Sequence, residues 1–273
     1  MSIQASDFKY ISDFIKKEAG IVLAPGKEYL VENRLTMLAM TLKIENIEKL
    51  ITKLREENSD NLKQKVVDAL TTNETSFFRD KHPFESLKSS ILPEIIKKRA
   101  AIRQLNIWCA ASSSGQEPYT LAMVLDQIPV LKGWKINFIA SDISEEMLER
   151  CRQGIYTQLE VGRGLPPNLL PRYFSRHKNC WQIKPELRGM IDFRIFNLCK
   201  QWPFMVNMDI IFLRHVLVYF NELTKREILG KVRKLLKPDG YLFVGSGDNP
   251  ENLDKKFVRT EFSTSACYKL ISP

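Results

Sequence analysis

The sequence predicts a small all-helical domain followed by a larger α/β domain with a mostly parallel sheet. Three observations lead to this fold class. Up to about residue 70, apolar residues recur only at helical spacing. From about residue 104, strands alternate with helices, the pattern of a mostly parallel sheet covered by helices on both faces. Between residues 154 and 200, glycines, prolines and short alternating runs indicate an insertion with its own small β-structure.

Length and composition set the limits of this interpretation. The 273 residues fit one large or two modest domains at ~100–200 residues each. No apolar run approaches the ~20 residues that span a bilayer. The N-terminus lacks a basic segment followed by an apolar core, so we expect a cytoplasmic protein without membrane insertion. The five cysteines and three histidines are scattered, and we expect no metal site.

The helical domain is expected to cover residues 1–70 and to contain four helices. Their apolar stripes run from Phe8 to Ile15, from Leu30 to Leu42, from Ile47 to Leu54 and from Leu62 to Leu70. Residues 71–90 are expected to form a linker that contributes to the site, and residues 91–273 the sheet domain, with the insertion at about 165–197. Nothing in the helical domain suggests catalysis.

The sheet domain is expected to place its chemistry at one edge, because open α/β sheets bind ligands beyond the carboxyl ends of their strands. The expected strands are Gln104–Ala110, Lys135–Ser141, Asp209–Leu213, Tyr241–Val244 and Ala266–Ile271, the last two as an antiparallel pair. The expected helices are Glu117–Gln127, Glu145–Gln153 and Thr224–Leu236.

Positive charge is concentrated in the insertion. The net charge is +9, and residues 151–200 hold nine lysines and arginines against three acidic residues. Such a segment attracts an acidic partner or nucleic acid, or it is a solvated surface loop, and the charge leaves both interpretations open.

Two of the expected strands end in groups suited to a nucleotide cofactor. Small residues from Ala110 to Gly115 let the backbone pass close to a ligand, although an ordinary tight turn needs them too. The loop is not G-x-G-x-x-G, which excludes the NAD fingerprint. Asp142 ends the second strand, where a carboxylate can accept hydrogen bonds from ribose hydroxyls. The alternative is that Asp142 or Ser144 caps the next helix.

Two further segments combine polar and aromatic residues. The linker run Thr71–Asp80 places Asn, Thr and Arg beside Phe77 and Phe78, which an ordinary linker does not require. After the strand Asp209–Leu213, Arg214, His215 and Tyr219 are expected to face the ligand crevice, whereas Phe220 is expected to pack a helix on the sheet.

Taken together, these segments resemble the CheR family of chemotaxis receptor methyltransferases over nearly the whole chain. The motifs are T-x-N-x-T-x-F-F-R (Thr71–Arg79), A-x-S-S-G-x-E-P-Y within Ala110–Tyr119, D-I-S (Asp142–Ser144) and R-x-V-L-x-Y-F (Arg214–Phe220). The resemblance implies a Rossmann-like, S-adenosylmethionine-dependent methyltransferase sheet with a small β-subdomain insertion. It implies methylation of glutamate side chains in the acidic methylation helices of methyl-accepting chemotaxis receptors, with S-adenosylhomocysteine as product. We further expect a monomer that binds no nucleic acid.

The resemblance also assigns site residues. Around the cofactor it places Asn73, Thr75, Arg79, Glu117, Asp142, Asn197, Leu198, Arg214 and His215, and nearest the transferred methyl group it places Arg79 and Tyr219 as catalytic residues. The chain departs from the family at Gln116, where an acid is common, and at His215, where asparagine is common.

Some family members dock on a peptide at the receptor's C-terminus through a glycine-rich loop. The matching stretch here, Tyr173–Ile183, has no glycine. Basic residues remain in and around it, namely Arg172, Arg176, Lys178, Lys184 and Arg188. We therefore expect docking on the receptor helices by charge, without a tethering peptide.

Other functions stay open. A methyltransferase of a related signalling pathway fits the same motifs. A nucleic-acid methyltransferase would explain the net charge, but it more often shows a Pro-aromatic motif or an active cysteine where this chain has Arg214 and His215. A cofactor sensor would keep Asp142 and Asn197 without Arg79 or Tyr219, and an interaction module would need neither pair.

Overall fold

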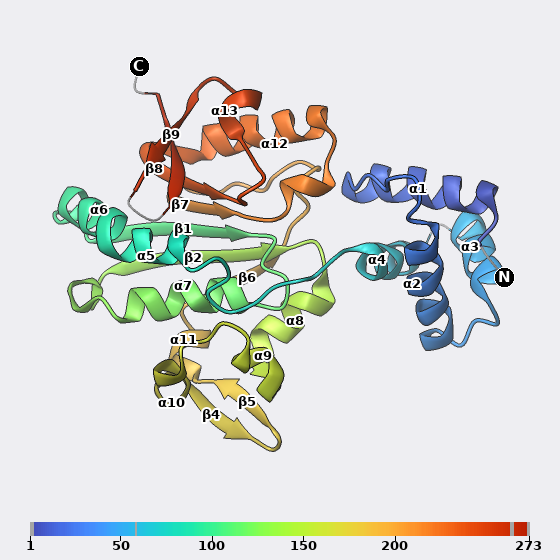
Figure 1. Ribbon diagram of the computed structural model, residues 1–273, viewed down its shortest axis with the longest axis horizontal. Helices are drawn as coiled ribbons and strands as arrows, with labels where there is room; N and C mark the ends of the chain where they lie inside the picture. The colour runs from blue at the N-terminus through green and yellow to red at the C-terminus, as the bar shows by residue number, and fades with distance from the viewer. Residues whose placement is uncertain (1–2, 58, 263–264, 272–273) are drawn as a thin grey trace.

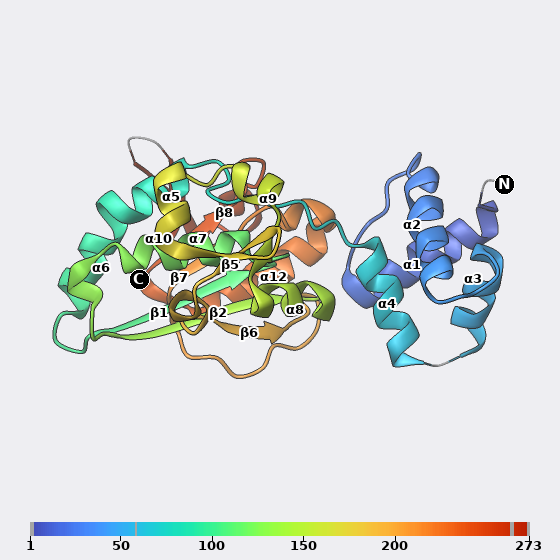
Figure 2. The same ribbon diagram turned by 90° about the horizontal axis from the view of Figure 1, so that it is seen from below.

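The computed structural model describes residues 3–57, 59–262 and 265–271. A helical domain and a sheet domain are joined by an extended linker that begins at Thr71 (Figure 1). The helical domain lies beyond the carboxyl ends of the parallel strands, and both views agree on this placement (Figure 2). The second domain therefore meets the edge of the sheet at which α/β proteins bind ligands.

Four helices form the N-terminal domain, as the apolar spacing predicts. They are α1 (Ala5–Ala19), α2 (Glu28–Thr41), α3 (Ile47–Glu56) and α4 (Asp60–Leu70). Local chemistry sets their ends: the Asn46 side chain accepts a hydrogen bond from the Lys49 backbone N–H at 2.8 Å, and Gly20 ends α1 at φ 72°. The buried apolar side chains of all four helices form one core.

The large sheet has seven strands in the order β6-β2-β1-β7-β8-β10-β9, of which the first five are parallel. The strands are β1 (Gln104–Ala110), β2 (Lys135–Asp142), β6 (Asp192–Ile195), β7 (Met208–Leu213), β8 (Leu236–Val244), β9 (Phe257–Glu261) and β10 (Ala266–Leu270). β10 pairs antiparallel with β8, with Tyr268 opposite Leu242. The predicted fold class and the antiparallel closing pair are confirmed.

Helices cover both faces of this sheet. Alternate strand residues point to opposite faces: Ile107 and Phe212 join one core, and Trp108 and Ile211 join the other. Against the first face pack α5 (His82–Ser86), the π-helical turn η1 (Leu87–Ile91), α6 (Leu92–Arg99) and α7 (Gln116–Asp126), and against the second packs α12 (Glu222–Leu235). Helix α8 (Glu145–Gln153) follows β2. Residues 82–91 therefore belong to the core of the sheet domain.

The insertion differs from the prediction in one strand. The small antiparallel sheet has the order β3-β5-β4, from β3 (Ile155–Tyr156), β4 (Phe174–His177) and β5 (Cys180–Ile183). The short alternating runs between residues 154 and 200 were expected to form this small β-structure, but β6, which lies in that range, pairs with β2 at the edge of the large sheet. A short alternating run carries no information about its pairing partner, and only the chain path decides it. The edge strand β9 has no counterpart among the predicted strands.

Short elements complete the chain. They are η2 (Pro129–Leu131), α9 (Gln158–Gly162), η3 (Pro167–Leu169), α10 (Leu170–Tyr173), α11 (Pro185–Arg188), η4 (Leu217–Tyr219) and α13 (Pro250–Leu253). Within the described residues, no helix combines the length and the apolar character that crossing a membrane requires.

A buried carboxylate ties the amino ends of the strands together. Asp209 of β7 is 1% exposed and accepts hydrogen bonds from Arg99 Nε of α6, Lys237 Nζ of β8 and the Asn106 backbone N–H of β1, each at 2.9 Å. Two cations and a backbone donor thus compensate one buried charge, and four elements share it.

We predict that Asp209→Ala lowers the free energy of unfolding by about 3–5 kcal/mol, because it leaves the two cations without their buried partner. Urea denaturation measures the effect. The matched control is Asp192→Ala on β6, whose exposed pair with Arg194 is expected to contribute only about 0–1 kcal/mol. Equal losses in the two variants would contradict the prediction.

Candidate functional site

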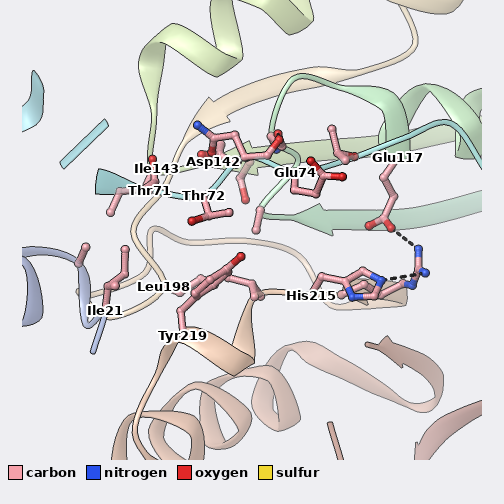
Figure 3. A pocket seen from close by; sticks show the side chains of 18 of the residues that line it. Ile21, Thr71, Thr72, Glu74, Glu117, Asp142, Ile143, Leu198, His215 and Tyr219 are labelled. Atoms are coloured by element: carbon pink, nitrogen blue, oxygen red, sulfur yellow. Dashed lines mark hydrogen bonds and ion pairs between the residues drawn. The ribbon is translucent and has the colours of Figure 1, made fainter. Parts of the chain in front are cut away.

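A pocket of about 920 Å³, part of it open to solvent, lies at the carboxyl ends of β1, β2 and β7. The structure brings all ten predicted site residues into its lining: Asn73, Thr75, Arg79, Glu117, Asp142, Asn197, Leu198, Arg214, His215 and Tyr219. Figure 3 shows how several of them converge.

Asp142 lies buried at the end of β2 and organises the neighbouring loop. Its Oδ2 accepts from the Ser113 backbone N–H at 2.8 Å, and its Oδ1 accepts from the Ser144 backbone N–H at 3.0 Å. The helix cap is Ser144, whose Oγ accepts from the Met147 N–H. A carboxylate can accept about four hydrogen bonds, so Asp142 keeps capacity for a ligand's hydroxyl groups. Burial raises the pKa of Asp142, and the backbone donors oppose this shift.

The loop between β1 and α7 is compact and strained. Ala111 and Ser113 have φ values of 54° and 50°, and Gly115 has φ 99°. A Cβ on Gly115 would lie 2.8 Å from the Tyr156 hydroxyl, so glycine is required there for both its conformation and its size. Ser113 Oγ also donates to the Asn73 backbone carbonyl at 2.9 Å, which joins the loop to the linker.

A buried guanidinium connects the linker to the sheet. Arg214, at the end of β7, forms ion pairs with Glu117 at the start of α7 and, at 2.6 Å, with Asp80 of the linker. The Arg214 Nη2 atom that contacts Asp80 also donates to the Arg79 backbone carbonyl at 3.0 Å. Arg214 therefore sets the position of Arg79 in addition to lining the pocket.

His215 continues this network. Its Nε2 lies 2.9 Å from Asp80 Oδ2, and its backbone has φ 57°, a conformation that histidine and asparagine adopt more often than most residues. Burial, with the charges of Arg214 and Arg79, lowers the pKa of His215, and the contact with Asp80 opposes this shift. Burial raises the pKa of Asp80, but the charge of Arg214 and the contact with His215 lower it overall.

Arg79 and Tyr219 approach the pocket from different elements. Arg79 is half-buried on the linker, and its Nη1 donates to the Glu74 backbone carbonyl at 2.8 Å. Tyr219 belongs to η4, and its side chain points into the pocket (Figure 3). A cation and a phenol thus line the same space as the Asp142 carboxylate.

The helical domain supplies part of the wall, which the sequence interpretation missed. Ala19 and Ile21 line the pocket. Asn197 Nδ2 donates to the Glu18 carbonyl at 2.7 Å, and Asn197 Oδ1 accepts from the Cys199 N–H at 2.9 Å. The Asn197 amide therefore joins the two domains.

Other lining residues were also not predicted. They are Thr71, Thr72, Glu74, Ala111, Ser113, Ser141, Ile143, Phe196, Val216 and Phe220. Most of them neighbour a motif residue, so the motifs themselves were the available signal. Ala19 and Ile21 carry no comparable local signal.

Two family models match the chain. A model described as the CheR methyltransferase all-alpha domain matches residues 6–71, and one described as the CheR methyltransferase SAM binding domain matches residues 73–266. The second match covers the predicted site residues from Asn73 to Tyr219, so the cofactor of this pocket is S-adenosylmethionine (SAM).

Similar proteins cover the chain almost end to end. Chemotaxis protein methyltransferase 1 of Pseudomonas aeruginosa is 39% identical and aligns over 98% of this chain and 99% of its own. The chemotaxis protein methyltransferase of Escherichia coli is 36% identical over 94% of this chain and 89% of its own. The solved glycopeptide N-methyltransferase MtfA with SAM is 12% identical, covers 63% of this chain and 51% of its own, and has a TM-score of 0.37.

Across residues 3–57, 59–262 and 265–271, no group of three or more histidine, cysteine or acidic side chains could hold a metal ion.

We predict that Asp142→Asn weakens binding of S-adenosylhomocysteine by about 1–3 kcal/mol, because charged hydrogen bonds to hydroxyl groups become neutral ones. The raised pKa adds a pH dependence: affinity for the wild-type chain should fall as the pH drops through that pKa, when the carboxylate becomes protonated. Calorimetry over a pH series measures both effects.

The matched control is Glu145→Gln, which removes an exposed carboxylate three residues away that pairs with Arg152. It should bind with wild-type affinity. Unchanged affinity in a folded Asp142→Asn variant would show that Asp142 only supports the loop.

Proposed function

The chain belongs to the CheR methyltransferase family, and on this premise we propose that it methylates glutamate side chains of bacterial chemotaxis receptors. The product would be a glutamate methyl ester, made for sensory adaptation in chemotaxis. The observation that carries the proposal is the convergence of the Arg79 guanidinium and the Tyr219 phenol in the pocket that also holds Asp142. The proposal treats the enzyme as a cytoplasmic monomer that acts on protein rather than on nucleic acid.

The residues of the pocket fit the cofactor. When bound, SAM supplies an electrophilic methyl group on a sulfonium. Asp142 would accept the ribose hydroxyls with its remaining lone pairs, while Ser113 and Ser144 hold its carboxylate in place. Leu198 would contribute apolar wall, and Glu117, held by Arg214, would face the cationic end of the ligand.

The acceptor needs orientation more than activation. A glutamate with a reference pKa of ~4.3 is ionised at pH 7, so no general base is required. Alignment of reacting groups can contribute about 7–11 kcal/mol. Arg79 would hold the acceptor carboxylate, and Tyr219 would donate to its oxygen or close the wall beside it. Loss of one negative charge on the receptor helix would then alter the packing that carries the signal.

The insertion supports docking by charge. A two-residue turn at Lys178 and Asn179 joins β4 to β5, with Lys178 at φ 53°. Three of the five basic residues have internal partners: Arg172 pairs with Asp126, and Lys184 and Arg188 donate to backbone carbonyls. Arg176, which stacks on the Trp181 ring at 4.2 Å, and Lys178 remain as candidates for an acidic receptor surface. We propose that this contact needs no C-terminal receptor peptide.

We predict that radiolabelled SAM and a receptor signalling fragment yield protein-bound label that base releases, as a carboxyl ester requires.

Arg79→Ala should lower kcat at least about tenfold, because the acceptor loses its orienting cation. The melting temperature should fall by no more than a few degrees, since the Arg79 side chain is only half-buried.

Arg163→Ala is the matched control. Its guanidinium also contacts the linker, through Glu74, but does not line the pocket. This variant should keep most of the activity. If the label is stable to base, the product is not a carboxyl ester. If the activity of Arg79→Ala falls only in proportion to its stability, Arg79 is a structural residue.

We predict equal methylation, within about twofold, of intact receptor and receptor lacking its last residues, because charge rather than a tethered peptide would drive docking. The rate should fall with added salt, since exposed charges are screened over ~8 Å at physiological ionic strength. The double variant Arg176→Gln, Lys178→Gln should lose most of this salt dependence, and Arg172→Gln should retain it. A large drop on truncation would show a peptide-dependent enzyme.

A further inference from the structure

A second hollow adjoins the cofactor pocket at Arg214, which lines both. Its wall includes Asp80 of the linker, the loop of residues 245–249 after β8, Arg259 of β9 and Tyr268 of β10. No residue of loop 245–249 lines the cofactor pocket. The proposed reaction therefore leaves this hollow without a role.

Asp248 is the unusual group in this wall. The residue is 8% exposed, and its Oδ2 is buried without a hydrogen-bond partner among the described residues. Burial raises the pKa of its carboxyl group, opposed by the charges of Lys225 and His215 and by a backbone hydrogen bond from Gly245. Asp80 differs, because Arg214 and His215 both contact its Oδ2. Asp248 lines the hollow, and its Oδ2 lacks a hydrogen bond within the described part of the chain although buried polar atoms are nearly always paired.

Gly245 lets the loop that carries this carboxylate lie close to the cofactor pocket. A Cβ at position 245 would lie 3.0 Å from the His215 backbone nitrogen, 3.2 Å from His215 Nδ1 and 3.2 Å from Asp248 Oδ2. The missing side chain lets the loop approach the pocket residue His215. The Asp248 N–H donates to the Gly245 carbonyl at 3.0 Å, which closes the turn. The unpaired oxygen and the cofactor pocket are therefore near neighbours.

The charges in the hollow select the kind of donor. Arg214 compensates Asp80, and Arg259 pairs with Glu261 at 3.1 Å. Among the described residues Asp248 forms no ion pair, and Lys225 and His215 act on it only through longer-range charge, so the wall carries one carboxylate charge without a paired cation. A neutral donor would bond to the oxygen but leave that charge buried, whereas a cation would also compensate it.

We propose that this hollow binds a lysine or arginine side chain of the acceptor protein, close to the glutamate that is methylated. The proposal rests on the function proposed above. On a helical acceptor, residues three and four positions apart lie on one face, so a glutamate in the cofactor pocket can bring such a neighbour to the adjoining hollow. Asp248 would thus determine specificity, without touching the reacting atoms.

The test uses receptor signalling fragments with a single methylatable glutamate and, three or four residues away, lysine, methionine or glutamate. For the wild-type chain, KM should be about tenfold lower for the lysine fragment than for the glutamate fragment. In the Asp248→Asn variant, the KM values for the lysine and glutamate fragments should differ by no more than about twofold. The kcat on the methionine fragment and the affinity for S-adenosylhomocysteine should stay unchanged. Glu251→Gln, on α13 outside the hollow, should keep the wild-type preference.

A second variant adds charge instead of removing it. A Cβ at Gly247 meets nothing within 4 Å, so Gly247→Glu should fold, and it should increase the preference for lysine.

Fluorescence anisotropy of the same fragments on the chain loaded with S-adenosylhomocysteine reports the preference without catalysis. If base releases no label but the preference for the lysine fragment persists, the proposed ester is refuted and the proposed binding site is not. Equal affinity for the lysine and glutamate fragments, or a preference that Asp248→Asn leaves unchanged, would overturn the proposal.

Discussion

The architecture of the pocket depends on the buried guanidinium of Arg214. It pairs with Glu117 on α7 and with Asp80 on the linker, and it donates to the Arg79 carbonyl of the same linker, so α7 and the linker are both held at the end of β7. Phe78, Asp80 and Lys81 all have positive φ values, which cost free energy in the linker. The ion pairs and the buried Phe77 offset that cost. A cation placed this way confines Arg79 to one position at the mouth of the pocket.

Domain packing supplies the second constraint. Arg34 of α2 donates to the carbonyls of Leu70 and Thr71 and to Thr72 Oγ1, so the helical domain controls where the linker begins. The α1–α2 connection also bonds to η4, through the Val22 N–H and the Tyr219 carbonyl at 2.9 Å. The all-helical domain, which carries no catalytic motif, thereby closes the pocket and helps to place the tyrosine. The buried Oδ2 atom of Asp248, which has no hydrogen bond among the described residues, belongs to a loop that packs beside His215 of this network.

Most of the fold could be predicted because its signals are local. β1 and α8 have the predicted limits, and β7 begins one residue earlier than expected. The predicted strand limits were wrong where pairing with a neighbouring strand, and not the local sequence, set the length of the strand. β8 begins at Leu236 instead of Tyr241, since Leu236 pairs with Met208 in spite of the turn residues between them. β6 joined the large sheet for the same reason: a strand of four residues is defined by its neighbour.

The sequence by itself determined the fold class, the family resemblance and the ten residues that meet in the pocket. The fold class follows from spacing and residue type along short stretches of chain, and the site residues are those that the family resemblance implies. Only the tertiary structure decided what those residues contact. It bonded the Asn197 amide to the helical domain, made Arg214 a link between α7 and the linker as well as a pocket residue, and left the Asp248 Oδ2 atom without a hydrogen bond among the described residues. Such contacts join residues up to 179 positions apart in the chain, and their geometry exists only once both domains have packed.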